Sequence, residues 1–161
     1  MSMPDQSVLA VDVGGWVGFD FEEVFGRPAK VINDAAMQAL GSYEGGKMLF
    51  LGLGTGLGSA LIVDGTVLPM ELGHLPFSQG DVRGLRRRAR RPPARQKKWK
   101  KAVDETIERL SAALEPDDIV LGGGNAKRVD ELPPNVRLGR NDNAFVGAFR
   151  LWDPDMPSPP R

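Results

Sequence analysis

The segment Gly54-Thr55-Gly56-Leu57-Gly58 combines three glycines with a hydroxyl side chain and lies between two apolar runs. Alternating glycines let a backbone approach a ligand closely and aim its N–H groups at it, and the Thr55 hydroxyl adds a further donor. These donors suit an anion such as phosphate. A flexible or bulged hairpin turn would contain the same glycines, so the segment alone supports both interpretations.

Two common phosphate-binding motifs do not fit the neighbouring residues. A dinucleotide fingerprint needs G-x-G-x-x-G between a strand and a helix, but Leu57 occupies the third glycine position counted from Gly52, and a strand is expected to follow. The segment GSYEGGK at 41–47 matches the first part of a P-loop, yet Met48 replaces the hydroxyl residue that would contact Mg²⁺. A Rossmann or P-loop site is therefore not expected.

Other polar residues follow short extended runs elsewhere in the chain. They are Asn33 with Asp34, Glu71 with His74 three residues later, and the segment Gly122 to Asn125. Ligand sites in α/β folds favour the ends of strands. Carboxylate and imidazole groups at such ends could hydrogen-bond the hydroxyls of a polyol, and Asp34 could also take a proton from one of them.

Each of these residues also has an ordinary structural interpretation. Asp34 is typical of a helix N-cap, which taken alone is the commoner role. His74 could be a partly buried, hydrogen-bonded imidazole, Glu71 a solvated strand residue, and Gly122 to Gly124 a turn. Only the combination of all of them points to a site.

The segment Met48 to Pro69 is expected to form the centre of the fold. Its apolar and β-branched runs flank Asp64-Gly65, which is a strong signal for a type I′ hairpin turn. Antiparallel pairing is therefore expected to begin the core. Before it, Asn33 or Asp34 is expected to cap a helix that ends at Gly41.

Two further helices are expected downstream. Lys97 to Leu114 carries an apolar residue every three or four positions, namely Trp99, Val103, Ile107, Leu110 and Leu114. A last helix, capped by Asn141 to Asn143, is expected to bury Phe145, Phe149 and Trp152. Residues 126 to 132 are expected to form one or two helical turns, and residues 78 to 96 an irregular loop, because glycines and prolines interrupt them.

The composition excludes several kinds of site. The 161 residues include no cysteine and one histidine, which excludes disulfides, thiolate metal sites and multi-histidine zinc sites. Val8 to Val13 is short and interrupted by Asp12, so we expect neither a signal peptide nor a membrane span there. This length suits one domain, or one domain with a remnant of another, and a cytoplasmic location is expected.

The charge is unevenly distributed although its formal sum is zero. The segment Arg83 to Lys101 contains 11 of the 21 Lys and Arg residues and no acid. This density suggests nucleic-acid binding as one alternative, for which only Trp99 offers an aromatic ring to stack on a base. A solvated loop, or a surface that attracts polyphosphate, would have the same charge.

Four motifs occur in a fixed order along the chain: VINDA at 31–35, LGLGTGLGSALIVDG at 51–65, ELGH at 71–74 and VLGGGN at 120–125. Together they resemble the ROK family of sugar kinases, specifically its glucokinase-like members within the actin-like ATPase superfamily. GGWVGFDFEEVFGRP near the start and NAFVGAFRLW near the end are also similar to that group. The resemblance implies an α/β chain with the actin-like ATPase (ribonuclease-H-like) sugar-kinase fold, mainly the second domain with a partial first domain.

The resemblance also implies a role for each candidate residue. Asp34 matches the general base that deprotonates the sugar hydroxyl, and Asn33, Asp34, Glu71 and His74 match sugar ligands. The implied reaction is phosphoryl transfer from ATP or polyphosphate, with Mg²⁺, to the 6-hydroxyl of glucose or a similar hexose. The positions that match nucleotide-binding residues are Gly54, Thr55, Gly56, Gly58, Gly122, Gly123, Gly124 and Asn125.

The chain departs from the family pattern in three places. Asp12 to Gly15 is followed by Trp16 rather than Thr, so we interpret it as the lead-in to the Gly-Trp segment and not as the family's first phosphate loop. The family's usual cysteine-rich zinc motif is absent, so no zinc is expected. Residues 78 to 96 do not resemble the family. The expected division is a remnant of the sugar-binding N-terminal domain at 1–46, a C-terminal nucleotide-binding domain at 47–152 and a proline-rich tail at 153–161.

These departures lead to expectations about activity and assembly. Sugar phosphorylation should be impaired, and a non-catalytic sugar- or nucleotide-binding remnant is the alternative from another class. Asp34 and Thr55 are expected on opposite walls of one cleft. Apolar surface around Val8 to Val13 and Val31-Ile32 is expected to favour a homodimer. No membrane partner is expected.

Overall fold

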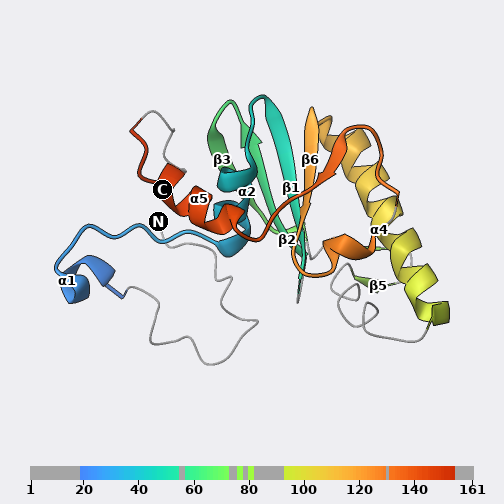
Figure 1. Ribbon diagram of the computed structural model, residues 1–161, viewed down its shortest axis with the longest axis horizontal. Helices are drawn as coiled ribbons and strands as arrows, with labels where there is room; N and C mark the ends of the chain where they lie inside the picture. Colours follow the sequence, from blue (N-terminus) through green and yellow to red (C-terminus); the bar gives the residue numbers. More distant parts are fainter. Residues whose placement is uncertain are drawn as a thin grey trace. The chain divides into compact units, whose positions relative to one another are not determined.

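The computed structural model describes residues 19–54, 57–72, 76–77, 80–81, 93–129 and 131–154 (Figure 1). The chain separates into two compact units, and the division lies between Val31 and Ile32. The described residues of the first unit form one short helix, and the second unit contains a five-stranded sheet with helices on both faces. Among the described residues, no helix combines the length and the apolar character needed to cross a lipid bilayer.

The first unit is built around helix α1 (Phe21–Phe25). The Asp20 carboxylate accepts a hydrogen bond from the Glu23 backbone N–H at 2.9 Å, and Gly26 ends the helix with a left-handed φ of 59°. The rings of Phe19 and Phe21 meet edge to face with centroids 4.9 Å apart. Because α1 is short and buries no residue of its own, its order depends on these local contacts.

The main sheet has the strand order β3-β2-β1-β6-β7. Its strands are β1 (Lys47–Leu53), β2 (Leu57–Val63), β3 (Thr66–Met70), β6 (Asp118–Gly122) and β7 (Val136–Leu138). β1, β2 and β3 pair antiparallel, whereas β6 runs parallel to β1 and β7 parallel to β6. Two short strands, β4 (Pro76–Phe77) and β5 (Gly80–Asp81), pair separately. The predicted α/β class is confirmed.

The turn between β2 and β3 has the predicted type I′ geometry. Asp64 and Gly65 both have positive φ, 47° and 82°, and they connect the paired residues Val63 and Thr66. The Tyr43 hydroxyl accepts a hydrogen bond from the Gly65 N–H at 2.9 Å. The turn is therefore fixed both by its own dihedral angles and by a contact from outside the hairpin.

Helix α4 (Pro93–Leu114) covers one face of the sheet (Figure 1). Four of the five residues in its predicted apolar stripe are buried with Leu49, Leu51 and Leu121 of the sheet: Trp99, Val103, Ile107 and Leu110. The helix begins four residues before the predicted Lys97, and the expected irregular loop at 78–96 is wrong where it overlaps α4 and β5. Pro93 is compatible with the helix because it occupies the first position, where no N–H partner is needed.

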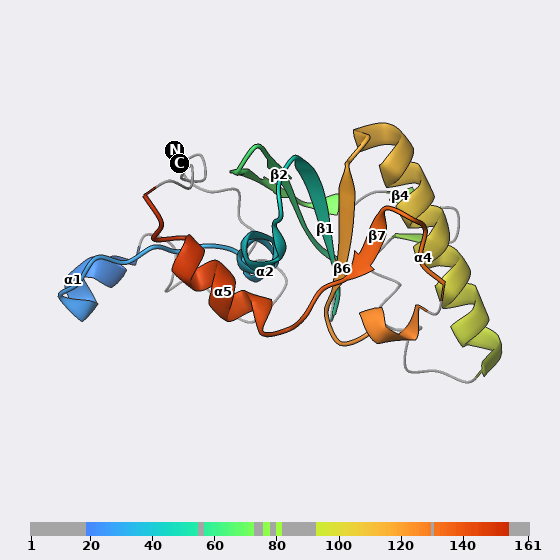
Figure 2. The same ribbon diagram turned by 45° about the horizontal axis from the view of Figure 1, so that its top comes forward.

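Helix α2 (Asp34–Ser42) covers the other face, and helix α5 (Asn143–Arg150) packs on the outer side of α2, as Figure 2 shows. The small apolar face of α2 is buried against Met48, Phe50 and Ile62: Ala35, Ala36, Ala39 and Leu40. α2 therefore belongs to the same compact unit as the sheet. That unit begins at Ile32, upstream of residue 46, where the predicted N-terminal remnant ends.

The two helices approach each other through glycines. A Cβ added at Gly147 would lie 1.8 Å from the Met37 carbonyl oxygen, and one added at Gly41 would lie 1.8 Å from the Asn143 carbonyl oxygen. No side chain fits at such separations. The α2–α5 contact is consequently a backbone-to-backbone contact that only glycine permits.

The predicted burial of the α5 aromatic residues is wrong. Phe145 is 73% exposed, Phe149 81% and Trp152 51%. The helix turns its other side, with Gly147 and Leu151, towards α2. Of the turns expected at 126–132, the described residues form one 3₁₀ turn at Ala126–Arg128.

Candidate active site

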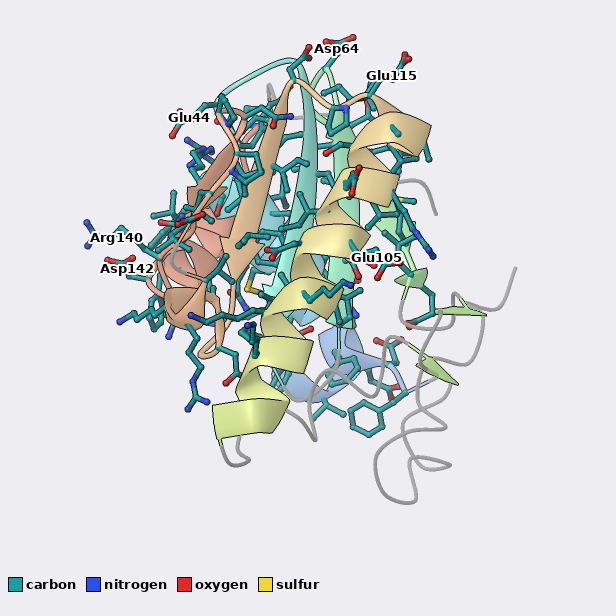
Figure 3. All side chains as sticks on the ribbon, turned by 90° about the vertical axis from the view of Figure 1, so that its right-hand side faces the viewer. Glu44, Asp64, Glu105, Glu115, Arg140 and Asp142 are labelled. Atoms are coloured by element: carbon teal, nitrogen blue, oxygen red, sulfur yellow. The ribbon has the colours of Figure 1, made fainter. Side chains whose placement is uncertain are left out.

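Three connecting segments meet at one edge of the main sheet. β1 and β6 are parallel, and Gly52 and Gly122 near their carboxyl ends are opposite each other in the register. β3 also ends at this edge, because Met70 pairs with Ser59 near the start of β2. The segments after β1, β3 and β6 therefore share the edge at which α/β folds place their ligands. The opposite edge carries the β2–β3 turn, where Figure 3 labels Asp64.

The glycine segment after β1 contacts the segment after β6. The Asn125 backbone N–H donates to the Leu53 carbonyl at 3.1 Å, and its side-chain amide donates to the Gly54 carbonyl at 3.4 Å. Gly123 has a φ of 82°, and a Cβ added there would lie 2.8 Å from the Leu53 carbonyl carbon. The two predicted nucleotide-binding segments are thus joined, and Gly123 is required for their close approach.

Gly54 and Gly124 differ from Gly123. A Cβ added at either would meet no atom within 4 Å, so the backbone on that side is open. Gly58 lies inside β2 and Gly122 ends β6. Two predicted site residues of the first segment, Thr55 and Gly56, lie outside the described residues, and their predicted role stays a prediction.

The first turn of α2 carries the predicted base. Asn33 is the N-cap, and its side-chain oxygen accepts from the Ala35 N–H at 2.8 Å and from the Ala36 N–H at 3.4 Å. Asp34 is the first helical residue, and one of its carboxylate oxygens accepts from the Ala35 N–H at 2.8 Å. The capping role therefore falls to Asn33, and the Asp34 side chain is exposed.

Helix α2 runs past both glycine segments. A Cβ added at Gly58 would lie 2.9 Å from the Ala35 Cβ, which places the start of α2 against the start of β2. One turn beyond Asp34, the Gln38 side-chain oxygen lies 3.3 Å from the position that a Cβ at Gly122 would occupy. Sequence reasoning missed Gln38. Its spacing of four residues from Asp34 on a predicted helix was the signal that could have identified it.

The exit of β3 is held to β2 by one side chain. The Ser59 hydroxyl donates to the Met70 carbonyl at 2.9 Å and accepts from the Leu72 N–H at 3.2 Å. Glu71, between them, is exposed and lies at the same sheet edge as the glycine segments. His74 lies outside the described residues, so its predicted pairing with Glu71 remains a prediction.

The first turn of α2 does not itself offer free phosphate donors. Its Ala35 and Ala36 N–H groups already donate to the side chains of Asn33 and Asp34, and Asp34 brings a negative charge to this turn. In the described part of the chain, no three His, Asp or Glu side chains gather closely enough to form a metal site. Mg²⁺ bound to phosphates usually takes only one or two protein carboxylates and keeps several waters. Asp34 and Glu71 are the exposed carboxylates in the described segments that reach this edge.

Comparisons with known proteins agree with the resemblance that was predicted from the sequence. The chain matches no family model. It is 28% identical over 134 residues to polyphosphate glucokinase of Mycobacterium tuberculosis, across 74% of this chain and 51% of that protein. The crystal structure of an inorganic polyphosphate/ATP-glucomannokinase from an Arthrobacter strain is 30% identical with a TM-score of 0.61, across 88% of this chain and 64% of that one. A ROK family glucokinase from Streptomyces griseus, in complex with glucose and AMPPNP, has a TM-score of 0.60.

The chain resembles the ROK sugar kinases over part of their length. It spans about half the length of the curated relatives it matches. The Streptomyces glucokinase is only 16% identical, across 79% of this chain and 69% of that one, and its likeness therefore concerns the fold alone. The predicted ROK resemblance and the predicted actin-like ATPase sugar-kinase fold are both confirmed.

Proposed function

We propose that this chain carries the phosphoryl-transfer half of a ROK-type sugar kinase, which moves a phosphoryl group from ATP or polyphosphate to the 6-hydroxyl of glucose. The observation that supports this most strongly is that α2, the glycine segment after β1 and the segment after β6 lie together at one sheet edge. Phosphoryl transfer needs three parts in one place: a base, backbone N–H groups that bind the phosphates, and a loop that contacts the nucleotide.

In this proposal Asp34 is the general base. Its carboxylate takes the proton of the sugar hydroxyl, while the hydroxyl oxygen bonds to the terminal phosphorus and the bridging oxygen leaves with ADP or the shortened polyphosphate. Backbone N–H groups around Gly54 to Gly58 stabilise the charge on the transferred group. Asn33, Glu71 and His74 orient the sugar, and the segment Gly122 to Asn125 contacts the adenosine side.

Mg²⁺ is the metal that this reaction implies, and when bound with the phosphates it neutralises their charge. Because Asp34 serves as the base and Glu71 as a sugar ligand, Mg²⁺ would be held mainly by the phosphate oxygens and by water. The proposal includes no zinc site.

The relatives suggest both the donor and the sugar. Their names specify inorganic polyphosphate or ATP as donor and glucose or mannose as acceptor. The basic segment Arg83 to Lys101 would favour a polyanionic donor electrostatically. Nucleic-acid binding is the weaker use of that segment, because Trp99 is 1% exposed and cannot stack on a base.

The test is sugar phosphate formation by the purified chain. Radiolabelled ATP and radiolabelled polyphosphate are supplied separately with glucose and Mg²⁺, and labelled glucose 6-phosphate is quantified. We expect transfer above the enzyme-free rate with at least one donor. Binding of glucose and ADP without any transfer would favour the non-catalytic alternative, and absence of both binding and transfer would overturn the proposal.

We further propose that turnover by the chain alone is slow. The chain spans about half of its relatives' length, and no segment in it matches the first phosphate loop well. Loss of one preorganised donor typically costs roughly 3–4 kcal/mol of transition-state stabilisation. We therefore expect a kcat at least about 10²-fold below that of a complete relative measured in parallel. A kcat equal to that of the relative would contradict this.

Gly123→Ala is expected to weaken ADP binding about tenfold or more. The substitution forces an L-residue into a φ of 82° and places a methyl group against the Leu53 carbonyl, so the segment after β6 must move away from β1. Isothermal titration with ADP measures the loss. Gly45→Ala is the control, because it also places an L-residue at a positive φ (127°), its methyl group meets no atom within 4 Å, and it lies before β1, away from the nucleotide segments. Equal affinities of the two variants would show that the close approach is unimportant for binding.

A further inference from the structure

Helix α2 carries one long polar side chain on the same side as the proposed base. In the helix sequence DAAMQALGS, Gln38 is the polar residue between Asp34 and Ser42, and it follows Asp34 by four positions. Residues four apart in a helix lie on one side of it, about one turn or 5.4 Å from each other. The Gln38 carboxamide is therefore one helical turn away from the Asp34 carboxylate.

The Gln38 side chain lies against the start of the nucleotide-side segment. Its Oε1 is 3.3 Å from the position that a Cβ at Gly122 would occupy, and Gly122 is the last residue of β6. A Cβ at Gly122 would also overlap the Phe50 ring, so this position has no room for a side chain of its own. The carboxamide consequently lies between the proposed base and the segment Gly122 to Asn125.

The donors of this carboxamide are not used within the described structure. The backbone carbonyl of Gln38 accepts from the Ser42 hydroxyl at 2.7 Å, but none of the described residues hydrogen-bonds the side-chain amide. The side chain is half-buried. A carboxamide has two N–H donors and a carbonyl acceptor, and polar groups that leave water normally find partners. These N–H groups are therefore available to a ligand bound at this edge.

The backbone donors of the same part of α2 are already occupied. The Ala35 and Ala36 N–H groups donate to the Asn33 side chain, and the Met37 N–H donates to the Asn33 carbonyl at 2.9 Å. Asp34 adds a negative charge, which repels an anion. The Gln38 amide is thus the neutral donor through which this part of α2 can bind a phosphate.

We propose that the Gln38 carboxamide donates a hydrogen bond to a phosphate of the donor substrate that is not itself transferred. This assignment rests on the proposed kinase function and adds a donor-binding residue to it. Asp34 acts on the sugar hydroxyl at the reacting phosphate, whereas Gln38, one turn along α2 and beside Gly122, contacts the donor on its nucleotide side. Because the contact is to phosphate and not to adenosine, it serves ATP and polyphosphate alike.

The test is the affinity of three Gln38 variants for ADP and for tripolyphosphate, measured by isothermal titration with Mg²⁺ present. Gln38→Leu removes the donor and should weaken both ligands roughly 10- to 100-fold, the range for a hydrogen bond to a charged group. Gln38→Glu should weaken both further, since it adds repulsion. Gln38→Lys should bind both within about threefold of the unmodified chain, because an ammonium on a flexible stem also donates to phosphate.

Two controls separate this contact from damage to the fold. Asn135→Asp makes the same change from amide to carboxylate at an exposed position before β7, at the opposite edge of the sheet, and should leave both affinities unchanged. The affinity of Gln38→Leu for glucose should also stay unchanged, since Gln38 is assigned to the donor and not to the sugar.

The order of the three variants decides between a phosphate contact and simple packing. If Gln38→Lys lost as much affinity as Gln38→Glu, the amide would only pack on Gly122 and the proposal would be wrong. Gln38→Leu with unchanged affinities, or with an equal loss for glucose, would also overturn it while leaving the kinase function standing. An unmodified chain that bound neither ADP nor tripolyphosphate would overturn the proposed function together with the role of Gln38.

Discussion

Asp34→Asn is expected to lower kcat for sugar phosphorylation by about 10²- to 10⁴-fold, the contribution typical of a positioned general base. The amide cannot accept the proton of the sugar hydroxyl, although it has nearly the same shape as the carboxylate. Because Asn33 and not Asp34 caps α2, the substitution leaves the start of the helix intact. The effect should therefore appear in kcat, with a much smaller change in KM for glucose.

The measurement is the rate of labelled glucose 6-phosphate formation at saturating glucose and donor. Asp64→Asn is the matched control, because Asp64 lies in the turn at the opposite edge of the sheet, where Asn tolerates its φ of 47°. This control should retain the rate of the unmodified chain. If Asp34→Asn retained it as well, Asp34 would not be the base, and the kinase proposal would lose its central residue.

The parts of the fold that could be predicted from the sequence are those determined by residues close together in the chain. The type I′ turn follows from the positive φ angles that Asp64-Gly65 permits, and the cap at Asn33 follows from its side-chain oxygen. The apolar stripe of α4 is unambiguous because its opposite side is charged. In each case a few neighbouring residues contain all the information that is needed.

The α5 error has a different origin. Helical periodicity identified Phe145, Phe149 and Trp152 as one side of a helix, but it does not specify which side meets α2. That choice is made by Gly147 opposite Gly41, residues with no hydrophobic signal. Close backbone approach outweighed the preference for burying aromatic rings. The geometry is decided by tertiary packing, which a single sequence pattern does not contain.

The candidate site was predicted in part for the same reasons. Glycines and polar residues at strand ends indicated which segments matter, and parallel pairing of β1 and β6 brings two of these segments together. The contacts that join them are not local. Asn125 donates hydrogen bonds to the carbonyls of Leu53 and Gly54, and Gln38 lies beside Gly122. Both contacts depend on how α2 and β6 are placed on β1.

Gly147→Ala is expected to cause the largest loss of stability of the substitutions considered. The added methyl group would lie 1.8 Å from the Met37 carbonyl oxygen and the Gly41 N–H nitrogen is only 3.0 Å away, so the obstacle is backbone that belongs to a packed helix. Alanine favours a helix over glycine by up to about 1 kcal/mol, whereas overpacking of this kind costs about 1–3 kcal/mol and occasionally more. Because the clash is with backbone, we expect the upper end and a net loss of about 2 kcal/mol.

This loss should lower the Tm by roughly 5–10 °C for a compact unit of this size, measured by differential scanning calorimetry. Gly124→Ala makes the same chemical change where a methyl group meets no atom within 4 Å, and its Tm should stay close to that of the unmodified chain. Displacement of α5 would also break the hydrogen bonds from Arg150 to Leu40 and Tyr43, so amide hydrogen exchange should rise in α5 first. A Tm for Gly147→Ala equal to that of Gly124→Ala would mean that α5 does not contact α2 through its glycine, and the exposure of Phe145, Phe149 and Trp152 would lose its structural explanation.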